Sequence, residues 1–250
     1  MNYPNLRKKK ISVIIPACNE EYRLPTALKF LQVIRRVEYP NLEIIVSING
    51  SHNPKALKLI AQQNGAKAIH SAKGPSAARN AGALASSGEI LIFMDADVLL
   101  KPGVISRIAG LVKENTVGTC TAYPDIINVK TLLLVWGKNF VRSSGLLKGM
   151  SELVFCHRSL FIEKKIGFDP QMKLGEIHDF FSRAIKGAQA KYIYIHTPMS
   201  ECWKFSVNRY ERNGYIKTLM FWVRWWFFTQ LLKRDSKPFE QEYWITVEPD

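Results

Sequence analysis

The chain has 250 residues, of which 47% are hydrophobic and 22% charged, with 35 Lys and Arg against 21 Asp and Glu. This length can bury the core of one large α/β domain, and the composition excludes wholesale disorder. The net charge of +14 favours an anionic partner, such as a phosphorylated ligand, an acidic membrane surface or nucleic acid, and does not by itself choose among them.

The N-terminus and the cysteines bear on the cellular compartment. Residues 1–10 are polar and basic, and no apolar segment of signal-peptide length follows them. The four cysteines form no Cys-x-x-Cys pair and have no zinc-like spacing, which is typical of buried thiols in a reducing compartment. We therefore expect a cytoplasmic protein with a basic tail over residues 1–10.

Strands and helices are predicted to alternate through the first hundred residues. Short runs rich in β-branched residues predict the strands, and apolar residues at helical spacing predict the helices. The strands are expected at residues 11–16, 42–48, 66–69 and 89–94, and the helices at residues 24–37, 54–64 and 75–87. Such alternation is typical of a mostly parallel sheet covered by helices, in which ligands bind at the carboxyl ends of the strands.

The second half of the chain is less regular. Strands are expected at residues 117–122, 153–157 and 191–195, and helices at residues 131–141 and 176–186. No internal repeat and no linker rich in Pro or Gly divides the chain. We therefore expect one catalytic domain over residues 11–205, followed by a basic, aromatic segment over residues 206–250.

Two carboxylates follow the fourth predicted strand. The apolar run at residues 90–94 ends at Asp95-Ala96-Asp97. Carboxylates so placed can hold Mg²⁺ or Mn²⁺, which prefer oxygen ligands and can bridge to phosphates. They can equally cap the turn after the strand, so the motif alone leaves both interpretations open.

Four stretches of the chain, taken in order, resemble the family 2 glycosyltransferases of the GT-A fold. They are Pro16-Ala17-Cys18-Asn19-Glu20, Gly74-Pro75-Ser76-Ala77-Ala78-Arg79-Asn80-Ala81-Gly82, Asp95-Ala96-Asp97, and Gly167-Phe168-Asp169 with Gly175-Glu176, Asp179 and Arg183. Each stretch is weak alone, and the ordered set covers about residues 11–215. The resemblance implies an α/β, Rossmann-like GT-A sheet flanked by helices, here followed by a C-terminal amphipathic aromatic helix.

The resemblance also implies a donor site for a nucleotide-diphosphate sugar. Pro16, Ala17 and Glu20 would line the nucleoside pocket, and Arg79 would approach the diphosphate or the sugar. Family members usually carry an aspartate after the second strand, where this chain has Asn49. Asn49 can still donate and accept hydrogen bonds, so it stays a candidate for the nucleotide site, and the nucleobase stays open. Arg79 has a simpler alternative as a surface salt bridge.

The metal site implied by the resemblance centres on the two aspartates. Asp95 would face the donor, and Asp97 would be the more direct ligand of Mg²⁺ or Mn²⁺. His196 follows the last predicted strand. Some GT-A enzymes supply a third metal ligand from this region, although His196 can equally be a structural histidine.

Ile177 stands where the family commonly has its catalytic aspartate. The family commonly has a Glu-Asp pair here, and this chain reads Glu176-Ile177-His178-Asp179. Helical spacing puts Ile177 on the apolar stripe and puts Glu176, Asp179 and Arg183 on a different face. The base is therefore Glu176 or Asp179, with a slight preference for Glu176 because Arg183 would pair with Asp179. His178 is a third candidate, more simply explained as a surface histidine.

The C-terminal segment alternates basic and aromatic residues. Its apolar part, residues 219–232, would span roughly 21 Å as a helix, short of a ~30 Å hydrocarbon core, and Arg224 interrupts it. Such a helix suits the interface of an anionic leaflet. The alternative is that its aromatic face packs on the catalytic domain or on a second subunit.

These features predict a metal-dependent, inverting hexosyltransferase at the inner face of a membrane, with a saccharide or a polyprenyl phosphate as acceptor. A phosphate acceptor is already anionic and would need no base. One rival is a nucleotidyltransferase, whose glycine-rich loop after the first strand is missing here. The other is a non-catalytic scaffold of the same fold that binds membrane or nucleic acid. No nucleic-acid-binding motif accompanies the charge, so nucleic acid is not expected.

Overall fold

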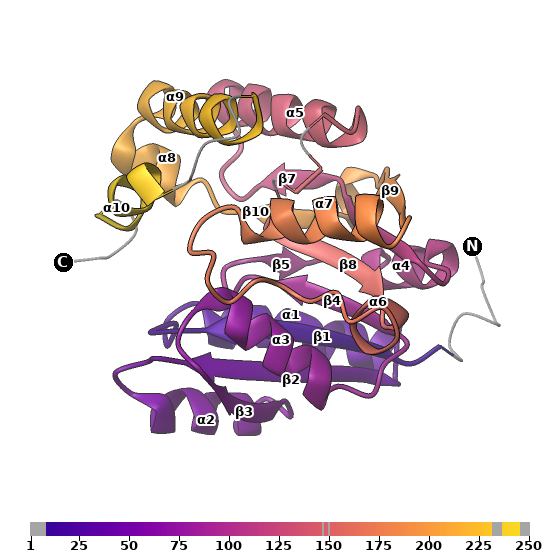
Figure 1. Ribbon diagram of the computed structural model, residues 1–250. Coiled ribbons are helices and arrows are strands. Elements are labelled where there is room, and N and C mark those ends of the chain that lie inside the picture. The colour runs from indigo at the N-terminus through magenta and orange to yellow at the C-terminus, as the bar shows by residue number, and fades with distance from the viewer. Residues whose placement is uncertain (1–8, 147, 150, 232–236, 246–250) are drawn as a thin grey trace.

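A seven-stranded sheet forms the centre of the molecule, which we describe from a computed structural model over residues 9–146, 148–149, 151–231 and 237–245 (Figure 1). The strand order is β3-β2-β1-β4-β8-β6-β9. Only β8 runs antiparallel to its neighbours, β4 and β6, and the other pairs are parallel. The strands are β1 (Ile11–Ala17), β2 (Leu42–Asn49), β3 (Lys67–Ser71), β4 (Ile90–Met94), β6 (Thr116–Cys120), β8 (Leu153–His157) and β9 (Lys191–Ile195).

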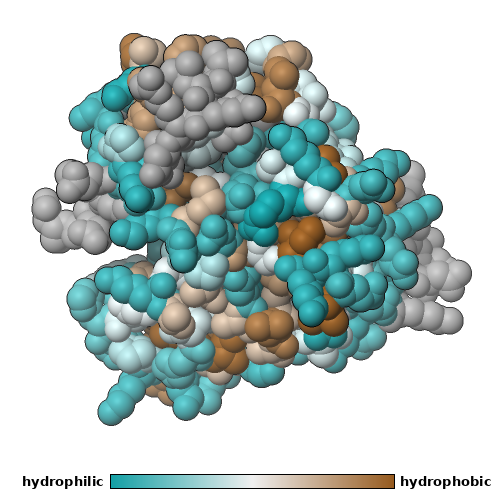
Figure 2. Space-filling model, in the orientation of Figure 1, coloured by the Kyte–Doolittle hydropathy of each residue, from teal (hydrophilic) through white to brown (hydrophobic). Residues whose placement is uncertain are grey.

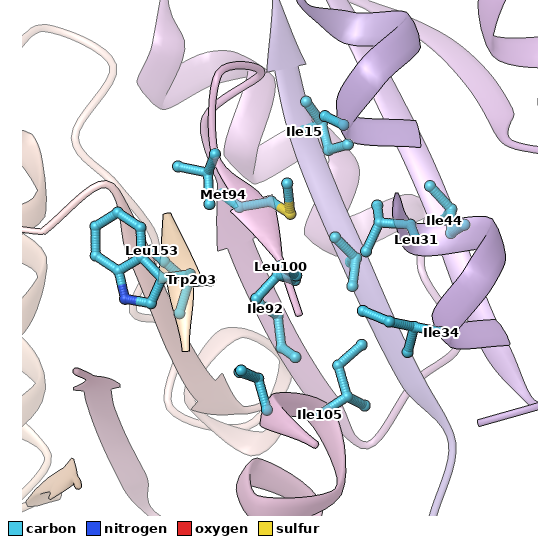
Figure 3. Close-up of a cluster of buried hydrophobic side chains, with 14 of the residues drawn as sticks. Ile15, Leu31, Ile34, Ile44, Ile92, Met94, Leu100, Ile105, Leu153 and Trp203 are labelled. Carbon is cyan, nitrogen blue, oxygen red and sulfur yellow. The ribbon is translucent and has the colours of Figure 1, made fainter. Parts of the chain in front are cut away.

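Helices cover both faces of this sheet. On one face pack α1 (Leu24–Val37), α2 (Pro54–Gln63) and α4 (Val104–Leu111), and on the other pack α3 (Pro75–Ala85), α6 (Ser159–Ile162) and α7 (Glu176–Gly187). Successive residues of a strand point to opposite faces, so Val13 and Ile15 join the first core while Ile14 joins the second. Figure 3 shows part of the first core, where Leu31 of α1 lies beside Ile44 of β2.

A small second sheet extends the first core. It contains β5 (Leu99–Leu100), β10 (Trp203–Phe205) and β7 (Ala122–Pro124) in that order, with the short 3₁₀ helix Met199–Glu201 before β10. Trp203 is fully buried, and its indole nitrogen donates a hydrogen bond to the Cys120 carbonyl. This indole therefore anchors the second sheet to the end of β6.

The remaining helices lie together above the sheet in Figure 1. They are α5 (Val129–Ser143), α8 (Asn208–Asn213), α9 (Tyr215–Trp226), which continues as a π-helical segment over Phe227–Leu231, and α10 (Lys237–Ile245). Phe221 and Trp225 of α9 form a separate cluster with Leu174 and Phe239. Among the described residues, no helix combines the length and the apolar character needed to cross a membrane.

The elements expected from the sequence are present, with bounds shifted by one or two residues. The expected strand at 117–122 divides into β6 and β7, and α4 and the small sheet were not anticipated. The expectation that all four cysteines are buried is wrong for Cys18, which is exposed in the loop after β1. The expected tail at residues 1–10 lies, up to residue 8, outside the described residues. β10 ends at Phe205, and Tyr210 of α8 still belongs to the first core, so the boundary expected at residue 205 stays a prediction.

Two glycines provide a matched test of this packing. Gly118 lies between β8 and β9, where an added Cβ would overlap the Ile193 carbonyl oxygen, whereas a Cβ on Gly137 of α5 meets nothing within 4 Å. We expect Gly118→Ala to lower the free energy of unfolding by about 2 kcal/mol through overpacking. Gly137→Ala should raise it by about 0.5–1 kcal/mol because alanine is the better helix former. Urea unfolding of both variants measures the difference, and equal effects would contradict the packing described.

Candidate active site

Two asparagines fix the loops at the carboxyl edge of the sheet. Asn19, with φ of 55°, accepts hydrogen bonds at Oδ1 from the Ser51 hydroxyl at 3.1 Å and the His52 amide at 2.9 Å. Asn49 is buried, and its Nδ2 donates to the Ala17 carbonyl while its Oδ1 accepts from the Gly74 amide. Asn49 therefore joins the ends of β1 and β2 to the loop before α3, a positioning role that sequence alone does not reveal.

The residues expected to line the nucleoside pocket differ in how they are placed. Ala17 is fully buried in the core, so it can offer a ligand only its backbone, and Pro16 is half-buried. Glu20 lies in the loop after β1. Burial raises the pKa of Glu20 to about 7, and the negative charges of Asp97 and Asp95 add to this rise. Glu20 thus belongs to the same electrostatic cluster as the two aspartates.

Arg79 is the buried centre of the site. Its side chain is 4% exposed, and its two terminal nitrogens donate to Asp95 Oδ1 at 2.9 Å and to Glu176 Oε1 at 2.8 Å. The guanidinium carbon also lies 5.5 Å from the centre of the Phe168 ring. The surface salt bridge considered for Arg79 is therefore wrong, because this arginine joins α3, the end of β4 and the start of α7.

The small residues of α3 explain how Arg79 reaches this position. An added Cβ on Gly82 would overlap the side chain of Ile14 in β1, so α3 packs directly on the sheet. Ala78 is likewise buried against the sheet. This close approach carries the neighbouring arginine under the end of β4, where the two aspartates begin.

Asp95 and Asp97 lie in crowded, negatively charged surroundings. Burial raises the pKa of Asp95 to about 6, with Asp97 and Glu152 adding to the rise and Arg79 opposing it. Burial also raises the pKa of Asp97, and Glu152 contributes again. The amide of Asp95 donates to the Glu152 carbonyl at 3.1 Å. Arg23 and Arg209 lie close enough to Asp97 to oppose the rise in its pKa.

Glu152 is the site residue that the sequence analysis missed. It immediately precedes β8, whose first residue, Leu153, pairs with Met94 of β4. Its carboxylate accepts from Lys138 Nζ at 2.8 Å and from Arg142 Nη2 at 3.0 Å, both on α5. Burial pushes the pKa of Glu152 upward, but these two cations outweigh it, so that its pKa is lowered. Burial lowers the pKa of Lys138 to about 8. No recognisable motif surrounds Glu152, although the basic pair at i, i+4 on α5 is a usable signal.

The two candidate bases are held by different arginines. Glu176 is the first residue of α7 and is 14% exposed beside Arg79. Asp179 accepts at Oδ2 from Arg183 Nε at 2.7 Å, and Arg183 also donates to the Gly167 carbonyl at 2.7 Å. The structure therefore joins Glu176 to Asp95 through Arg79, whereas no such link is described between Asp95 and the carboxylate of Asp179.

Packing at the start of α7 involves the C-terminal helices. Gly175, with φ of 80°, precedes Glu176, and an added Cβ there would overlap the indole of Trp225. The His178 ring lies edge-on to the same indole at 6.3 Å, so His178 is half-buried and not a plain surface histidine. Tyr243 of α10 lies near enough to Glu176 and Asp95 for their charges to raise its pKa, although burial is the larger cause. The C-terminal segment thus contacts the site directly.

The structure does not bring His196 to the two aspartates. His196 is exposed at the end of β9, with its ring 4.8 Å from that of Tyr194. β9 is three strands from β4, a separation of about 14 Å at ordinary strand spacing. Within the described residues, no three His, Cys, Asp or Glu side chains converge into a ready-made metal site. Asp97 and the second carboxylate oxygen of Asp95 still fit Mg²⁺ or Mn²⁺, because such ions are often held by one or two carboxylates together with substrate phosphates.

Comparisons with known proteins agree with this geometry. The family model described as "Glycosyl transferase family 2" matches residues 12–182. Glucosyl-3-phosphoglycerate synthase from Mycobacterium tuberculosis, solved with UDP, superposes with a TM-score of 0.53 at 18% identity, covering 78% of this chain and 74% of that one. The same synthase with Mn²⁺, UDP and glucosyl-3-phosphoglycerate gives 0.52 at 20% identity, covering 76% and 70%. S. aureus TarS gives 0.61 at 16% identity, covering 79% and 37%. Comparison with curated protein sequences gave no significant match. These likenesses confirm the expected GT-A fold.

Removing Arg79 tests whether it holds the site together. We expect Arg79→Met to lower the free energy of unfolding by about 3–5 kcal/mol, because Asp95 and Glu176 would be left without their buried cation. The control is Arg183→Met, which breaks an i, i+4 pair that is 40% exposed on the arginine and should cost at most about 1 kcal/mol. Urea unfolding measures both, and similar losses would mean that Arg79 is not the central cation.

Proposed function

The chain belongs to glycosyl transferase family 2, and on this premise we propose that it transfers a hexose from a nucleoside-diphosphate sugar to an acceptor with inversion at the anomeric carbon. One observation carries the proposal: buried Arg79 joins Asp95, on the donor side, to Glu176, on the acceptor side. The same cation thus positions one residue of each proposed half-site. The nucleotidyltransferase and scaffold alternatives are not favoured by this family membership.

The donor is proposed to lie along the carboxyl edge of the sheet between the loops after β1, β2 and β4. Asn19 and Asn49 hold the first two loops, and the third carries Asp95 and Asp97. The related mycobacterial synthase was solved with UDP, which supports a uridine nucleotide as the first donor to test. In this proposal Glu20 closes the nucleoside end, and the diphosphate lies beside the two aspartates.

We propose that Asp97, with help from Asp95, holds the divalent cation. The fit rests on their oxygen donors at the end of β4 and on the neighbouring carboxylate of Glu152, whose charge adds to the rise that burial causes in the pKa values of Asp95 and Asp97. A bound Mg²⁺ or Mn²⁺ would neutralise the charge of the departing diphosphate. Mn²⁺ in the related synthase supports this choice of metal. His196 is not needed in this arrangement.

The acceptor hydroxyl needs a group to take its proton, and this chain offers two. Both carboxylates accept from an arginine, Glu176 from Arg79 and Asp179 from Arg183, but only the arginine that holds Glu176 also binds Asp95 on the donor side. We propose Glu176 as the base when the acceptor is a saccharide. When the acceptor is a polyprenyl phosphate, its oxygen is already anionic, and Glu176 acts only to position Arg79.

The enzyme is proposed to work at the inner face of an anionic membrane. The net charge of +14 and the basic, aromatic helices of the C-terminal segment support this location. The aromatic side chains Phe221 and Trp225 themselves pack inward on Leu174 and Phe239, as the alternative in the sequence analysis expected. Any contact with lipid must therefore come from the other face of this helix.

Donor binding is the first measurement. We expect calorimetric titration to show binding of a UDP-linked or GDP-linked hexose that depends on Mn²⁺ and falls at least tenfold in Asp97→Ala, because the metal loses its main ligand. Glu163→Ala, which removes an exposed carboxylate after α6, serves as the matched control and should bind as the wild type does. If no donor binds to the wild type, the catalytic proposal fails and the scaffold alternative takes its place.

The two candidate bases are separated by their amide variants. With a saccharide acceptor, Glu176→Gln should lower kcat by about 10²–10⁴-fold, whereas Asp179→Asn should change kcat less than tenfold. With a polyprenyl phosphate acceptor, both variants should stay within about tenfold of the wild type. Full activity of Glu176→Gln on a saccharide would rule out this base. Product from a saccharide but none from polyprenyl phosphate would rule out the lipid acceptor.

A further inference from the structure

Helix α5 is inverted relative to an ordinary surface helix. Its apolar side chains Val129, Leu132, Leu133, Trp136 and Phe140 recur at i, i+3, i+4, i+7 and i+11, and each is 39–73% exposed. Two of its basic residues, Lys138 and Arg142, turn inward instead and bind Glu152. An amphipathic helix normally buries its apolar stripe. Here the charged partner of the active site occupies the inner face, so the apolar stripe is directed outward.

Helix α9 repeats this arrangement. The side chains of Ile216, Leu219, Met220, Val223 and Phe227 follow the same i, i+3, i+4, i+7, i+11 spacing and are 43–80% exposed. The inner side of α9 carries Phe221 and Trp225. Two helices from distant parts of the chain therefore present matching apolar stripes to the outside.

The two stripes lie on neighbouring helices. Val135, on the inner side of α5, shares a core cluster with Tyr210, and Leu134 and Tyr215 pack against the same cluster. A surface groove lined by Val129, Lys130, Glu211 and Tyr215 runs between the start of α5 and the start of α9. Figure 1 shows both helices along the upper side of the molecule, and Figure 2 shows brown apolar residues along that edge. We call the ten exposed side chains of the two stripes the α5–α9 face.

The charges of these helices are of one sign. Neither α5 nor α9 contains an aspartate or a glutamate, and together they carry Lys130, Lys138, Arg142, Lys217 and Arg224. Lys130 and Lys217 are exposed beside the apolar stripes, and Arg224 is half-exposed with Glu242 at 3.6 Å. An apolar stripe bordered by lysine and arginine is the composition of a helix that lies in the interface of an anionic bilayer.

We propose that the α5–α9 face docks on the surface of a bilayer that contains anionic lipids, with both helices lying in the plane of the interface. The inference rests on the membrane location proposed above and adds α5 as its second half. A second copy of the chain fits this face poorly. A symmetric contact would press together two faces that both carry the positive charges of Lys130, Lys217 and Arg224.

Docking in this way places the active site at the lipid surface. The inner side of α5 binds Glu152, whose carbonyl accepts from the Asp95 amide, and the inner side of α9 packs on Gly175, next to Glu176. Each proposed half-site is thus separated from the lipid by one helix, about 10 Å in diameter. An acceptor attached to a membrane lipid would span that distance to reach Glu176, which favours a lipid-linked acceptor with an extended head group over a soluble saccharide.

Vesicle flotation of the full chain, without donor or metal, tests the docking separately from catalysis. We expect the wild type to float with vesicles of phosphatidylcholine that contain about one third phosphatidylglycerol, and to bind pure phosphatidylcholine at least tenfold more weakly. Leu133→Ser/Trp136→Ser on α5 and Ile216→Ser/Met220→Ser on α9 should each lower binding to anionic vesicles by about tenfold or more, because buried apolar area is lost.

The matched control is Leu59→Ser/Leu84→Ser, which removes two equally exposed leucines from α2 and α3. This variant should bind vesicles as the wild type does. The proposal is overturned if the wild type does not float, if the control loses binding as the α5 variant does, or if sedimentation shows a dimer that the α5 and α9 variants convert to monomer without any vesicle binding. Donor titration on the same variants should be unchanged, so that a failure of docking is distinguished from a failure of the proposed chemistry.

Discussion

The burial of one guanidinium group organises this molecule. Arg79 can remain charged inside the protein only because two carboxylates face it, one at the end of β4 and one at the start of α7. Those two elements are therefore held at a fixed separation. This arrangement requires small residues on α3, because only they let the helix pack close enough to the sheet to bring Arg79 to the two carboxylates.

A second charged group supports the first from the other side. Glu152 is held by two cations of α5, and its backbone fixes the amide of Asp95. Because α5 must turn its basic residues toward Glu152, its apolar residues face outward. The electrostatics of the active site and the exposed apolar surface are thus two consequences of one helix orientation. A change on the outer stripe can alter docking without touching the site, whereas a change at Lys138 or Arg142 would disturb both.

Much of the fold could be predicted from the sequence because its signals are local. The short β-branched runs and the apolar residues at helical spacing predicted the alternation that β1–β4 and α1–α3 show. The order of the four stretches predicted the family, and the structure placed Arg79, Asp95 and Glu176 in contact. Helix α4 and the role of Glu152 were not predicted because neither belongs to a recognisable motif. His196 was expected near Asp95 and Asp97 because the order of the strands in the sheet cannot be inferred from their order in the chain.

The sequence by itself determined the class of fold, the family and the edge of the sheet where the chemistry lies, because periodicity and motif order are written in neighbouring residues. The tertiary structure decided which charges pair, since Arg79 and Glu176 are 97 residues apart and meet only when α3 and α7 pack on one face of the sheet. It also decided which side of α5 faces outward. Periodicity shows that a helix has an apolar and a polar side, but which side turns inward depends on the partner that the rest of the fold supplies, and here that partner is the partly exposed carboxylate of Glu152.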